Sequence, residues 1–298
     1  MERKGVTIVT HDGNFHTDDI FAVATLLLVL EKNYDVSVVR SREKDVILNG
    51  DYVVDVGGVY DPDKNRFDHH QAGGAGKRDN EIPYASFGLV WKKFGQILCG
   101  DREIADKIDQ VLVQPIDAID NGFQFIETKI PDVYPYDIGA FFDAFSPSWK
   151  EGNEHVDDIF LQMVSSAKML LSRKILKYKD KLEARLVVEK IYKESDDKKL
   201  IIFDRYYPSE EFLSKFPEPL FTVFPRADGK WGLKTIRNDI NSFVNRKSLP
   251  QTWAGKKDEE LEQITGVQGA LFCHTGRFIA VAKTKEAILK LAELALKD

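Results

Sequence analysis

The sequence predicts an α/β protein, with an N-terminal domain built on a parallel sheet, a helical connector and a smaller α+β domain. Two observations predict this organisation. Up to about residue 150, short β-branched runs alternate with helical patterns, whereas the residues after 195 form short strand-like runs and one closing helix. The chain has 298 residues, enough for two hydrophobic cores. We therefore expect domains at 1–150 and 196–298, joined by a connector at 151–195.

Three β-branched, mostly apolar runs predict the N-terminal strands: VTIV (6–9), VSVVR (36–40) and YVVDVGG (52–58). Runs of this composition are typical of parallel strands that are buried on both faces. Residues 19–32 begin with acidic side chains, as helices often do, so strand, helix and strand form a βαβ unit. Two further helices are predicted at 84–98 and 103–119.

The connector and the C-terminal domain follow from a change of pattern. Residues 156–194 contain neither proline nor glycine, which predicts one long helix or two in succession. An amphipathic pattern over 283–297 predicts a closing helix. Five short apolar runs predict the strands between them: KLIIFD, LFTVF, WGLKTI, GALFCH and RFIAVA.

The composition argues against several classes of protein. The longest apolar stretch, 20–30, is shorter than the roughly 20 residues that span a bilayer, and no secretory apolar region begins the sequence. Cys99 and Cys273 lie far apart and outside any CxxC spacing, so we expect reduced, structural thiols. We therefore expect a cytoplasmic protein without membrane contact. The net charge of -6 requires any anion-binding surface to be local.

Histidine and aspartate residues gather in four clusters at the ends of the predicted N-terminal elements. These are His11, His16 and Asp18 in THDGNFHTDD, Asp55 in VVDVGG, Asp68, His69 and His70 in RFDHHQ, and Asp117 and Asp120 in IDAIDNG. Ligand sites of open α/β sheets lie beyond the carboxyl ends of the strands, so His11 and Asp55 should lie close together. Mixed imidazole and carboxylate ligands suit Mn, Fe, Co or Zn better than Ca.

Each cluster also has a structural explanation when it is considered alone. Asp55 could accept hydrogen bonds in a turn, and Asp18 or Asp19 could begin a helix. His69 and His70 could lie in a surface loop, and Asp117 on a helix surface. Because four such clusters fall at element ends within one domain, a metal site explains them better together.

A basic segment in the C-terminal domain predicts a substrate surface. Residues 226–256 carry seven basic and two acidic side chains, with Trp231, Phe243 and Trp253 interleaved. Cations with stacking aromatic rings are typical of proteins that bind single-stranded nucleic acid. The alternative is a solvated sheet with aromatic residues in its core. The residues predicted to bind substrate are Arg226, Lys234, Arg237, Arg246, Lys247, Trp253, His274 and Arg277.

The ordered series THDGNFHTDD, VVDVGGVYDP, RFDHHQ and IDAIDNG resembles the melanocyte-proliferating-gene family, within the Asp-His-His (DHH) phosphoesterase superfamily of exonucleases and manganese pyrophosphatases. The resemblance continues through RKSLPQTWAGKKDEELEQITGVQGALFCHTGRFIA, so it covers nearly the whole chain. Members of the family have been labelled metal-dependent protein hydrolases and, later, 3′-5′ RNA exonucleases. The resemblance implies a DHH-phosphoesterase-like N-terminal domain.

The resemblance also implies roles for the clustered residues. Two divalent ions would share Asp55. Mn is the expected metal, with Mg, Co or Zn as alternatives. One ion would take His11 and His16; the other would take Asp18, His69 and a late aspartate, for which Asp120 fits better than Asp117. His70 would contact the scissile phosphate or protonate the leaving oxygen, and Asp68 would orient an imidazole.

The sequence departs from the family pattern at three places. Asp12 stands where asparagine is expected, and Asp19 stands where glutamate is expected. Ala280 and Val281 replace paired glycines, which argues against a close approach of substrate phosphate to the backbone there.

We therefore expect a divalent-metal-dependent phosphodiesterase, a 3′-5′ exonuclease that acts on single-stranded RNA or short oligonucleotides. Its catalytic domain would be the N-terminal one, and a homodimer is left open. Two alternatives remain: a small-molecule phosphoesterase or pyrophosphatase with the same metals, and a non-catalytic protein that binds metal and nucleic acid. Peptide hydrolysis has no support in the motifs beyond the metal itself.

Overall fold

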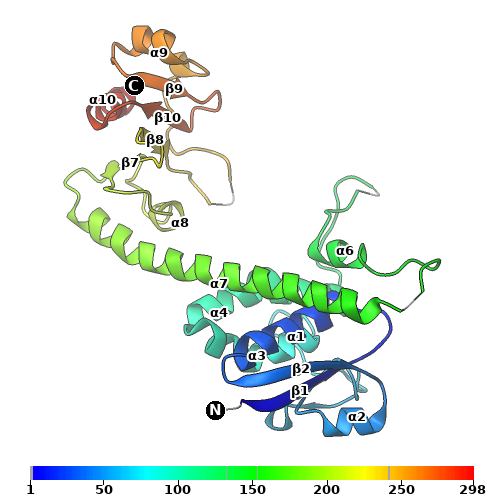
Figure 1. Cartoon of the computed structure of the whole chain (residues 1–298). Helices are drawn as coiled ribbons and strands as arrows, with labels where there is room; N and C mark the ends of the chain where they lie inside the picture. Colours follow the sequence, from blue (N-terminus) through cyan, green and yellow to red (C-terminus); the bar gives the residue numbers. More distant parts are fainter. Residues whose placement is uncertain (1–2, 132, 153, 241) are drawn as a thin grey trace. The chain divides into compact units, whose positions relative to one another are not determined.

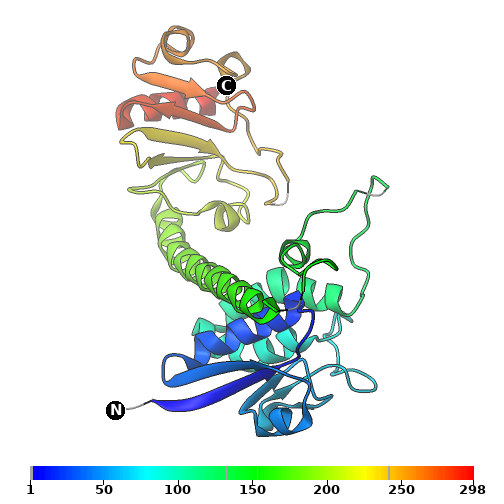
Figure 2. The same cartoon turned by 45° about the vertical axis from the view of Figure 1, so that its right-hand side comes forward.

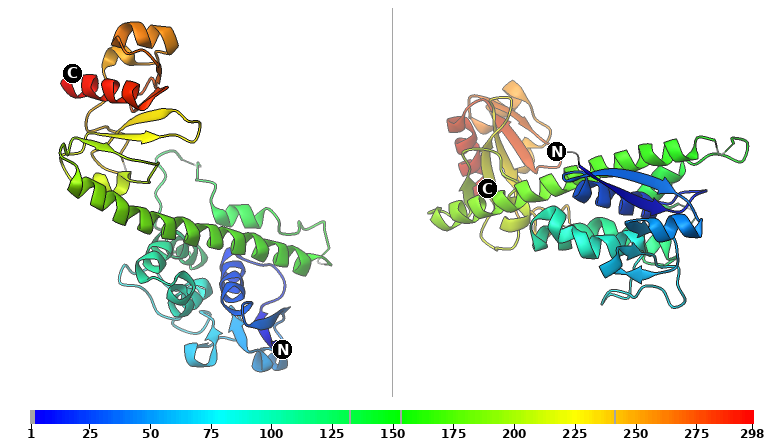
Figure 3. Two further views of the ribbon diagram at one scale, coloured as in Figure 1. Left: turned by 60° about the vertical axis from the view of Figure 1, so that its left-hand side comes forward. Right: turned by 60° about the horizontal axis from the view of Figure 1, so that its bottom comes forward.

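The chain forms two compact units, Met1–Tyr178 and Lys179–Asp298. The computed structural model describes residues 3–131, 133–152, 154–240 and 242–298. The division falls inside α7 (Val156–Glu194), a single helix of 39 residues within the segment predicted to be the connector (Figures 1 and 3). Since this stretch contains neither proline nor glycine, nothing in its backbone interrupts the helix.

The first unit is built on a sheet with the strand order β2-β1-β3-β5-β4. Its strands are β1 (Lys4–Thr10), β2 (Tyr34–Arg40), β3 (Tyr52–Val54), β4 (Tyr60–Asp61) and β5 (Arg66–Phe67). β1 pairs in parallel with β2 and β3, and β3 pairs in parallel with β5. β4 is antiparallel to β5. The α/β prediction is confirmed, but the sheet is mixed rather than purely parallel.

β2 contradicts the prediction that all three N-terminal strands are buried on both faces. It lies at the edge of the sheet, and its residues alternate between exposed and half-buried. In β1, which lies inside the sheet, Ile8 and Val9 are fully buried. Because β-branched residues suit both positions, composition alone does not distinguish an edge strand from a central one.

Helices cover both faces of this sheet (Figures 1 and 2). The helical segments of the first unit are α1 (Thr17–Leu30), α2 (Lys44–Asn49), η1 (Pro62–Lys64), α3 (Ser86–Cys99), α4 (Arg102–Ile108), the π-helical η2 (Asp109–Val113), α5 (Gln114–Asp120), α6 (Ile138–Asp143) and the first part of α7. α1 is apolar on nearly all sides because it packs against the sheet and against α3, α5 and α6. Phe21 of α1, for example, stacks on Phe87 of α3.

The second unit contains a sheet with the strand order β6-β7-β8-β10-β9, together with the end of α7. Its elements are β6 (Leu200–Ile202), α8 (Glu210–Leu213), β7 (Phe221–Pro225), β8 (Trp231–Thr235), η3 (Gln251–Trp253), α9 (Asp258–Thr265), β9 (Ala270–Cys273), β10 (Ile279–Ala282) and α10 (Lys285–Lys297). The five predicted strands and the closing helix are all present, whereas the sequence analysis missed α8 and α9. Among the described residues, we find no helix with the length and apolar character needed to cross a membrane.

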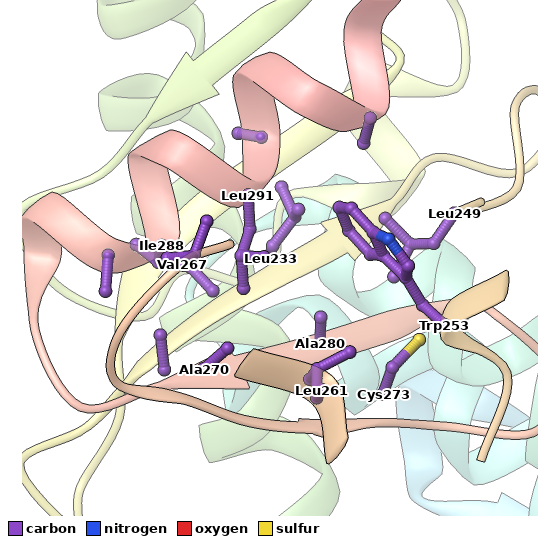
Figure 4. Close-up of a cluster of buried hydrophobic side chains, with 14 of the residues drawn as sticks. Leu233, Leu249, Trp253, Leu261, Val267, Ala270, Cys273, Ala280, Ile288 and Leu291 are labelled. Carbon is purple, nitrogen blue, oxygen red and sulfur yellow. The ribbon is translucent and has the colours of Figure 1, made fainter. Parts of the chain in front are cut away.

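Trp253 belongs to the core of the second unit. Its side chain is 3% exposed, within the cluster that includes Leu249, Leu261 and Cys273 (Figure 4). Leu291 of α10 closes the same cluster. Because other core residues cover the indole, it has no face on which a base could stack, and the predicted substrate contact of Trp253 is wrong.

Replacing this indole should destabilise the second unit. We expect Trp253→Ala to lower the free energy of unfolding by about 3–5 kcal/mol, because it leaves a large cavity in a packed core. Trp149→Ala is the matched control, since Trp149 is 89% exposed. Urea denaturation followed by circular dichroism measures both variants. Equal midpoints for the two variants would contradict the buried position of Trp253.

Candidate metal centre

The candidate site lies at the carboxyl edge of the first sheet. His11 follows β1, Asp55 follows β3, and the Asp68-His69-His70 triplet follows β5. These three strands are neighbours, so residues far apart in the sequence meet at one edge. Three groups have ligand atoms within 4.8 Å of one another: His11, His16 and Asp55; Asp55, His69 and His70; and Asp18, His69 and Asp120.

Asp55 lies at the centre of this arrangement. Its Oδ2 is 3.3 Å from Nε2 of His11, and its Oδ1 is 3.4 Å from Nε2 of His69. The hydroxyl of Ser86 donates to Oδ1 at 3.1 Å. The backbone of Asp55 is left-handed, with φ 55°, a conformation that costs a non-glycine residue free energy and is often found at functional sites.

The stretch THDGNFHTDD turns from β1 into α1 and carries ligands on both sides of the turn. His16 caps α1, and its backbone N–H donates to Oδ1 of Asp19 at 2.9 Å. Oδ2 of Asp19 lies 3.2 Å from Nε2 of His11. Arg40, at the end of β2, donates from Nη2 to the carbonyl oxygen of Gly13 at 2.7 Å and thereby fixes the turn.

Asp18 is held by the N-terminus of α3. Its two carboxylate oxygens accept the backbone N–H groups of Ser86 at 3.0 Å and Phe87 at 2.7 Å. A helix N-terminus presents unpaired N–H groups and a partial positive charge, so it stabilises a buried carboxylate. The sequence analysis assigned no role to Ser86, which reaches both Asp18 and Asp55.

Asp117 and Asp120 lie in different environments. Oδ2 of Asp120 is 3.2 Å from Nε2 of His69, among the candidate ligands. Asp117 is fully buried and accepts from Nη1 of Arg78 at 2.7 Å and from the backbone N–H of Gly88 at 3.0 Å. A Cβ on Gly88 would collide with this carboxylate. The geometry therefore favours Asp120 as a ligand and Asp117 as a structural group.

His70 and Asp68 form a pair beside Asp55. Nδ1 of His70 lies 2.8 Å from Oδ1 of Asp68, and the His70 side chain is 60% exposed. The buried Asp68 also accepts the backbone N–H groups of His70 and Gly58. Asp68 thus fixes the orientation of the ring, as the family resemblance implies. His70 is close enough to Asp55 and His69 to serve as a third ligand as well.

The crowded carboxylates shift one another's pKa values. Burial, reinforced by the charge of Asp120, raises the pKa of Asp18 well above its usual range, and burial raises that of Asp19 to about 7. Burial alone would also raise the pKa of Asp55, but His11 and His69 outweigh it and hold that pKa below its usual range. Burial opposes the charged form of His69, yet the carboxylates of Asp120 and Asp55 raise its pKa to about 11. Protons bound to these side chains therefore offset part of the negative charge of the cluster.

The residues fit divalent cations of the transition series. Nε2 of His11, Nε2 of His69 and Oδ2 of Asp19 are buried without a hydrogen-bond partner in the described part of the chain. Buried polar atoms normally have partners, and the contacts of 3.2 to 3.4 Å that these atoms make with carboxylates lack hydrogen-bond geometry, so a cation among them would supply the partner. Cations would replace the protons on the imidazoles and neutralise the carboxylates.

Two cavities open onto the cluster and share His16, Asp55 and His70. The larger, of about 580 Å³, also reaches Asp18, His69 and Asp120 and has an apolar wall that includes Phe15, Ile119, Ile138 and Phe142. The smaller, of about 190 Å³, is lined by His11, Arg42, Val56, Gly57, Gly58 and Asp68 in addition to the shared residues.

Comparison with known proteins places the chain in a family. The family model MYG1_exonuc, described as "Uncharacterised protein family (UPF0160)", matches residues 7–296. The chain belongs to the MYG1 family. This confirms the resemblance to the melanocyte-proliferating-gene family that the motifs indicated.

Three relatives illustrate the extent of the similarity. A "MYG1 protein" of Dictyostelium discoideum is 32% identical over 96% of this chain and 95% of its own length. A "MYG1 protein" of Chlamydia pneumoniae is 30% identical over 98% of this chain and 97% of its own length. The "MYG1 exonuclease" of Homo sapiens is 28% identical over 97% of this chain and 85% of its own length.

In this member of the MYG1 family, many basic residues of the second unit are bound within the unit. Arg246 donates to the backbone carbonyl oxygens of Phe216, Pro219 and Ser214, so its guanidinium holds a loop, and its role in binding substrate stays a prediction. Lys234 and Arg237 both pair with Glu210. The other predicted substrate residues also have partners within the unit. Arg226 pairs with Asp228, and Lys247 donates to the carbonyl of Leu296. Arg277 donates to the carbonyl of Leu249, and His274 accepts from the backbone N–H of Gly276.

The two aspartates of IDAIDNG should respond differently to the same substitution. We expect Asp117→Asn to lower the free energy of unfolding by about 2–3 kcal/mol, because Arg78 loses a buried charged acceptor. Asp120→Asn should reduce metal binding and lower the stability of the metal-free protein less than Asp117→Asn does, since the lost ion pair with His69 is offset by the removal of a charge that faces Asp18. Elemental analysis and thermal denaturation without metal test the pair. Loss of metal from the Asp117 variant alone would reverse the assignment.

Proposed function

We propose that this protein is a divalent-metal-dependent phosphodiesterase, a 3′-5′ exonuclease that acts on single-stranded RNA or short oligonucleotides in the manner of the Asp-His-His phosphoesterases. One observation carries the proposal: three groups of imidazole and carboxylate ligands, of which two share Asp55 and two share His69, lie at the wall of a cavity. The relatives named MYG1 exonuclease support a nuclease, and the direction of cleavage follows the resemblance implied by the motifs.

The overlap of the ligand groups supports two ions rather than one. His11 and His16 would hold the first ion, Asp18, His69 and Asp120 the second, and Asp55 both. When bound, such a pair lowers the pKa of an attacking water and stabilises charge on the oxygens of a phosphate. Manganese suits the mixed ligands best, with Mg, Co or Zn as alternatives.

His70 is the residue best placed to move a proton. Because Asp68 holds Nδ1, the ring keeps one orientation and its Nε2 is left for exchange with the substrate or the leaving oxygen. The exposure of the ring allows contact with a molecule in either cavity. Asp68 holds the ring in this orientation, as a positioning residue.

The apolar wall of the larger cavity supports an organic substrate over pyrophosphate. Ile119, which is 45% exposed, and the half-buried Ile138 offer an apolar surface that inorganic pyrophosphate cannot use, whereas a nucleobase would bury apolar area against it. The volume of about 580 Å³ lies in the range typical of cavities that hold small organic ligands.

The second unit would contribute to binding longer strands through side chains other than Trp253 and Arg246. Phe243 is 91% exposed, and the guanidinium of Arg237 lies 5.1 Å from the centre of its ring. An exposed aromatic ring beside a cation is a suitable platform for a stacked base.

A substrate panel tests the proposed function. After chelation and reloading with Mn²⁺, we expect the protein to release nucleotides one at a time from the 3′ end of labelled single-stranded RNA. Single-stranded DNA, a dinucleotide and pyrophosphate complete the panel. Turnover of pyrophosphate alone would select the small-molecule alternative, and RNA binding without metal-dependent turnover would select the non-catalytic one.

The same assay includes a matched pair of histidine variants. His70→Ala should keep its metal content and lower kcat by about 10²–10⁴-fold, the usual contribution of a general acid or base. His155→Ala, which removes an exposed histidine at the start of α7, should behave as the parent. If His70→Ala loses metal in proportion to activity, His70 is a ligand rather than a proton carrier.

A further inference from the structure

Each parallel strand of the first sheet is followed at its carboxyl end by charged or ionisable residues. After β2, the residue that lines the site is a cation, Arg42. β1, β3 and β5 supply His11, Asp55 and the Asp68-His69-His70 triplet. The chain leaving β2 continues beside β1, since the backbone N–H of Ser41 donates to the carbonyl of Thr10 at 2.8 Å. Arg42 follows directly and reaches the smaller cavity, which His16, Asp55 and His70 also line.

Arg42 differs from the other cations near the edge. Among the described residues that line either cavity at the cluster, it is the one lysine or arginine. The side chain of Arg40, two residues earlier, is buried; it pairs with Asp157 and donates to the carbonyl oxygen of Gly13. The side chain of Arg42 is 61% exposed, and its Nε lies 3.3 Å from Oδ1 of the equally accessible Asp12. Its two Nη atoms make no hydrogen bond within the described residues.

We infer that Arg42 binds a phosphate oxygen of the substrate in the smaller cavity, and that Asp12 competes with the phosphate for its guanidinium. The inference rests on the proposed function and goes beyond the metal ligands. A guanidinium offers paired donors that match two oxygens of a phosphate, and here it lines a cavity that shares His16, Asp55 and His70 with the larger cavity. The substrate phosphate would then lie between the ligands and Arg42, with its base in the larger cavity.

Asp12 weakens this contact because its negative charge lies beside the guanidinium, where it offsets the charge of Arg42 and repels a phosphate bound to the Nη atoms. Both partners are exposed and one contact joins them, so the ion pair itself is weak. A phosphate bound through the Nη atoms makes charge-assisted hydrogen bonds that are stronger than this single contact. Removing the Asp12 charge should therefore tighten phosphate binding, whereas removing Arg42 should weaken it.

Four variants test the inference: Arg42→Ala, Arg42→Lys, Asp12→Asn and, as control, Arg102→Ala, which removes an exposed arginine of α4. For each we would measure the KM for a short oligoribonucleotide and the Ki of inorganic phosphate. The Kd of the labelled oligoribonucleotide would come from fluorescence anisotropy with Ca²⁺ in place of Mn²⁺. Metal content and melting temperature would be recorded alongside.

We expect Arg42→Ala to raise KM, Ki and Kd by about 10- to 100-fold, the usual effect of a lost hydrogen bond to a charged group, with metal content and melting temperature unchanged. Arg42→Lys should fall between this variant and the parent, because it keeps the charge but loses the paired donors. Asp12→Asn should lower Kd about two- to fivefold, and Arg102→Ala should behave as the parent.

The outcomes separate this inference from the proposed function. Parental Kd and Ki for Arg42→Ala, or loss of metal from it, would overturn the role of Arg42 even if the enzyme degrades RNA. If the parent degrades no phosphodiester but binds phosphate and RNA through Arg42, the proposed function fails and the inference stands.

Discussion

The crowding of carboxylates at the carboxyl edge of the first sheet is the constraint on which the rest of this structure depends. Asp18, Asp19 and Asp55 are buried, with Asp120 close by, and such charges are unfavourable away from water unless they are compensated. The fold supplies part of the compensation: the N-terminus of α3 holds Asp18, and the hydroxyl of Ser86 reaches Asp55. The imidazoles supply more, and the buried atoms without a hydrogen-bond partner among the described residues lie where a bound cation would fit.

Residues around the site fix the segments that carry the charged side chains. Arg40 links three segments, because it pairs with Asp157 of α7, binds the carbonyl of Gly13 and lies 4.6 Å from the ring centre of Phe160. The first part of α7 thus helps to fix the turn that carries His16. The buried pair of Arg78 and Asp117 holds α5 against α3. These two buried arginines orient ligands without being ligands.

The sequence predicts which side chains of the first unit lie close together because some strand ends are readable. His11 and Asp55 follow predicted strands, and parallel strands bring their ends together, whereas β5, the strand before His69, has only two residues and was not predicted. The contacts of Asp19 and Ser86 at the site were not predicted. An acid in the first turn of a helix and a serine at a helix start are also common caps, so their sequence positions do not indicate a site. Substrate-binding residues of the second unit are harder to predict. An arginine that binds carbonyl oxygens, as Arg246 does, cannot be distinguished in the sequence from one that binds phosphate.

The central claim is that two cations share Asp55, and anomalous diffraction from Mn²⁺-loaded crystals measures this most directly. The account predicts two peaks in each chain, one in contact with His11 and His16 and the other with Asp18, His69 and Asp120, with Asp55 touching both. Crystals of an Asp55→Asn variant, grown and loaded in the same way, should lose occupancy at both positions. A single peak, or two peaks of which neither touches Asp55, would contradict the account.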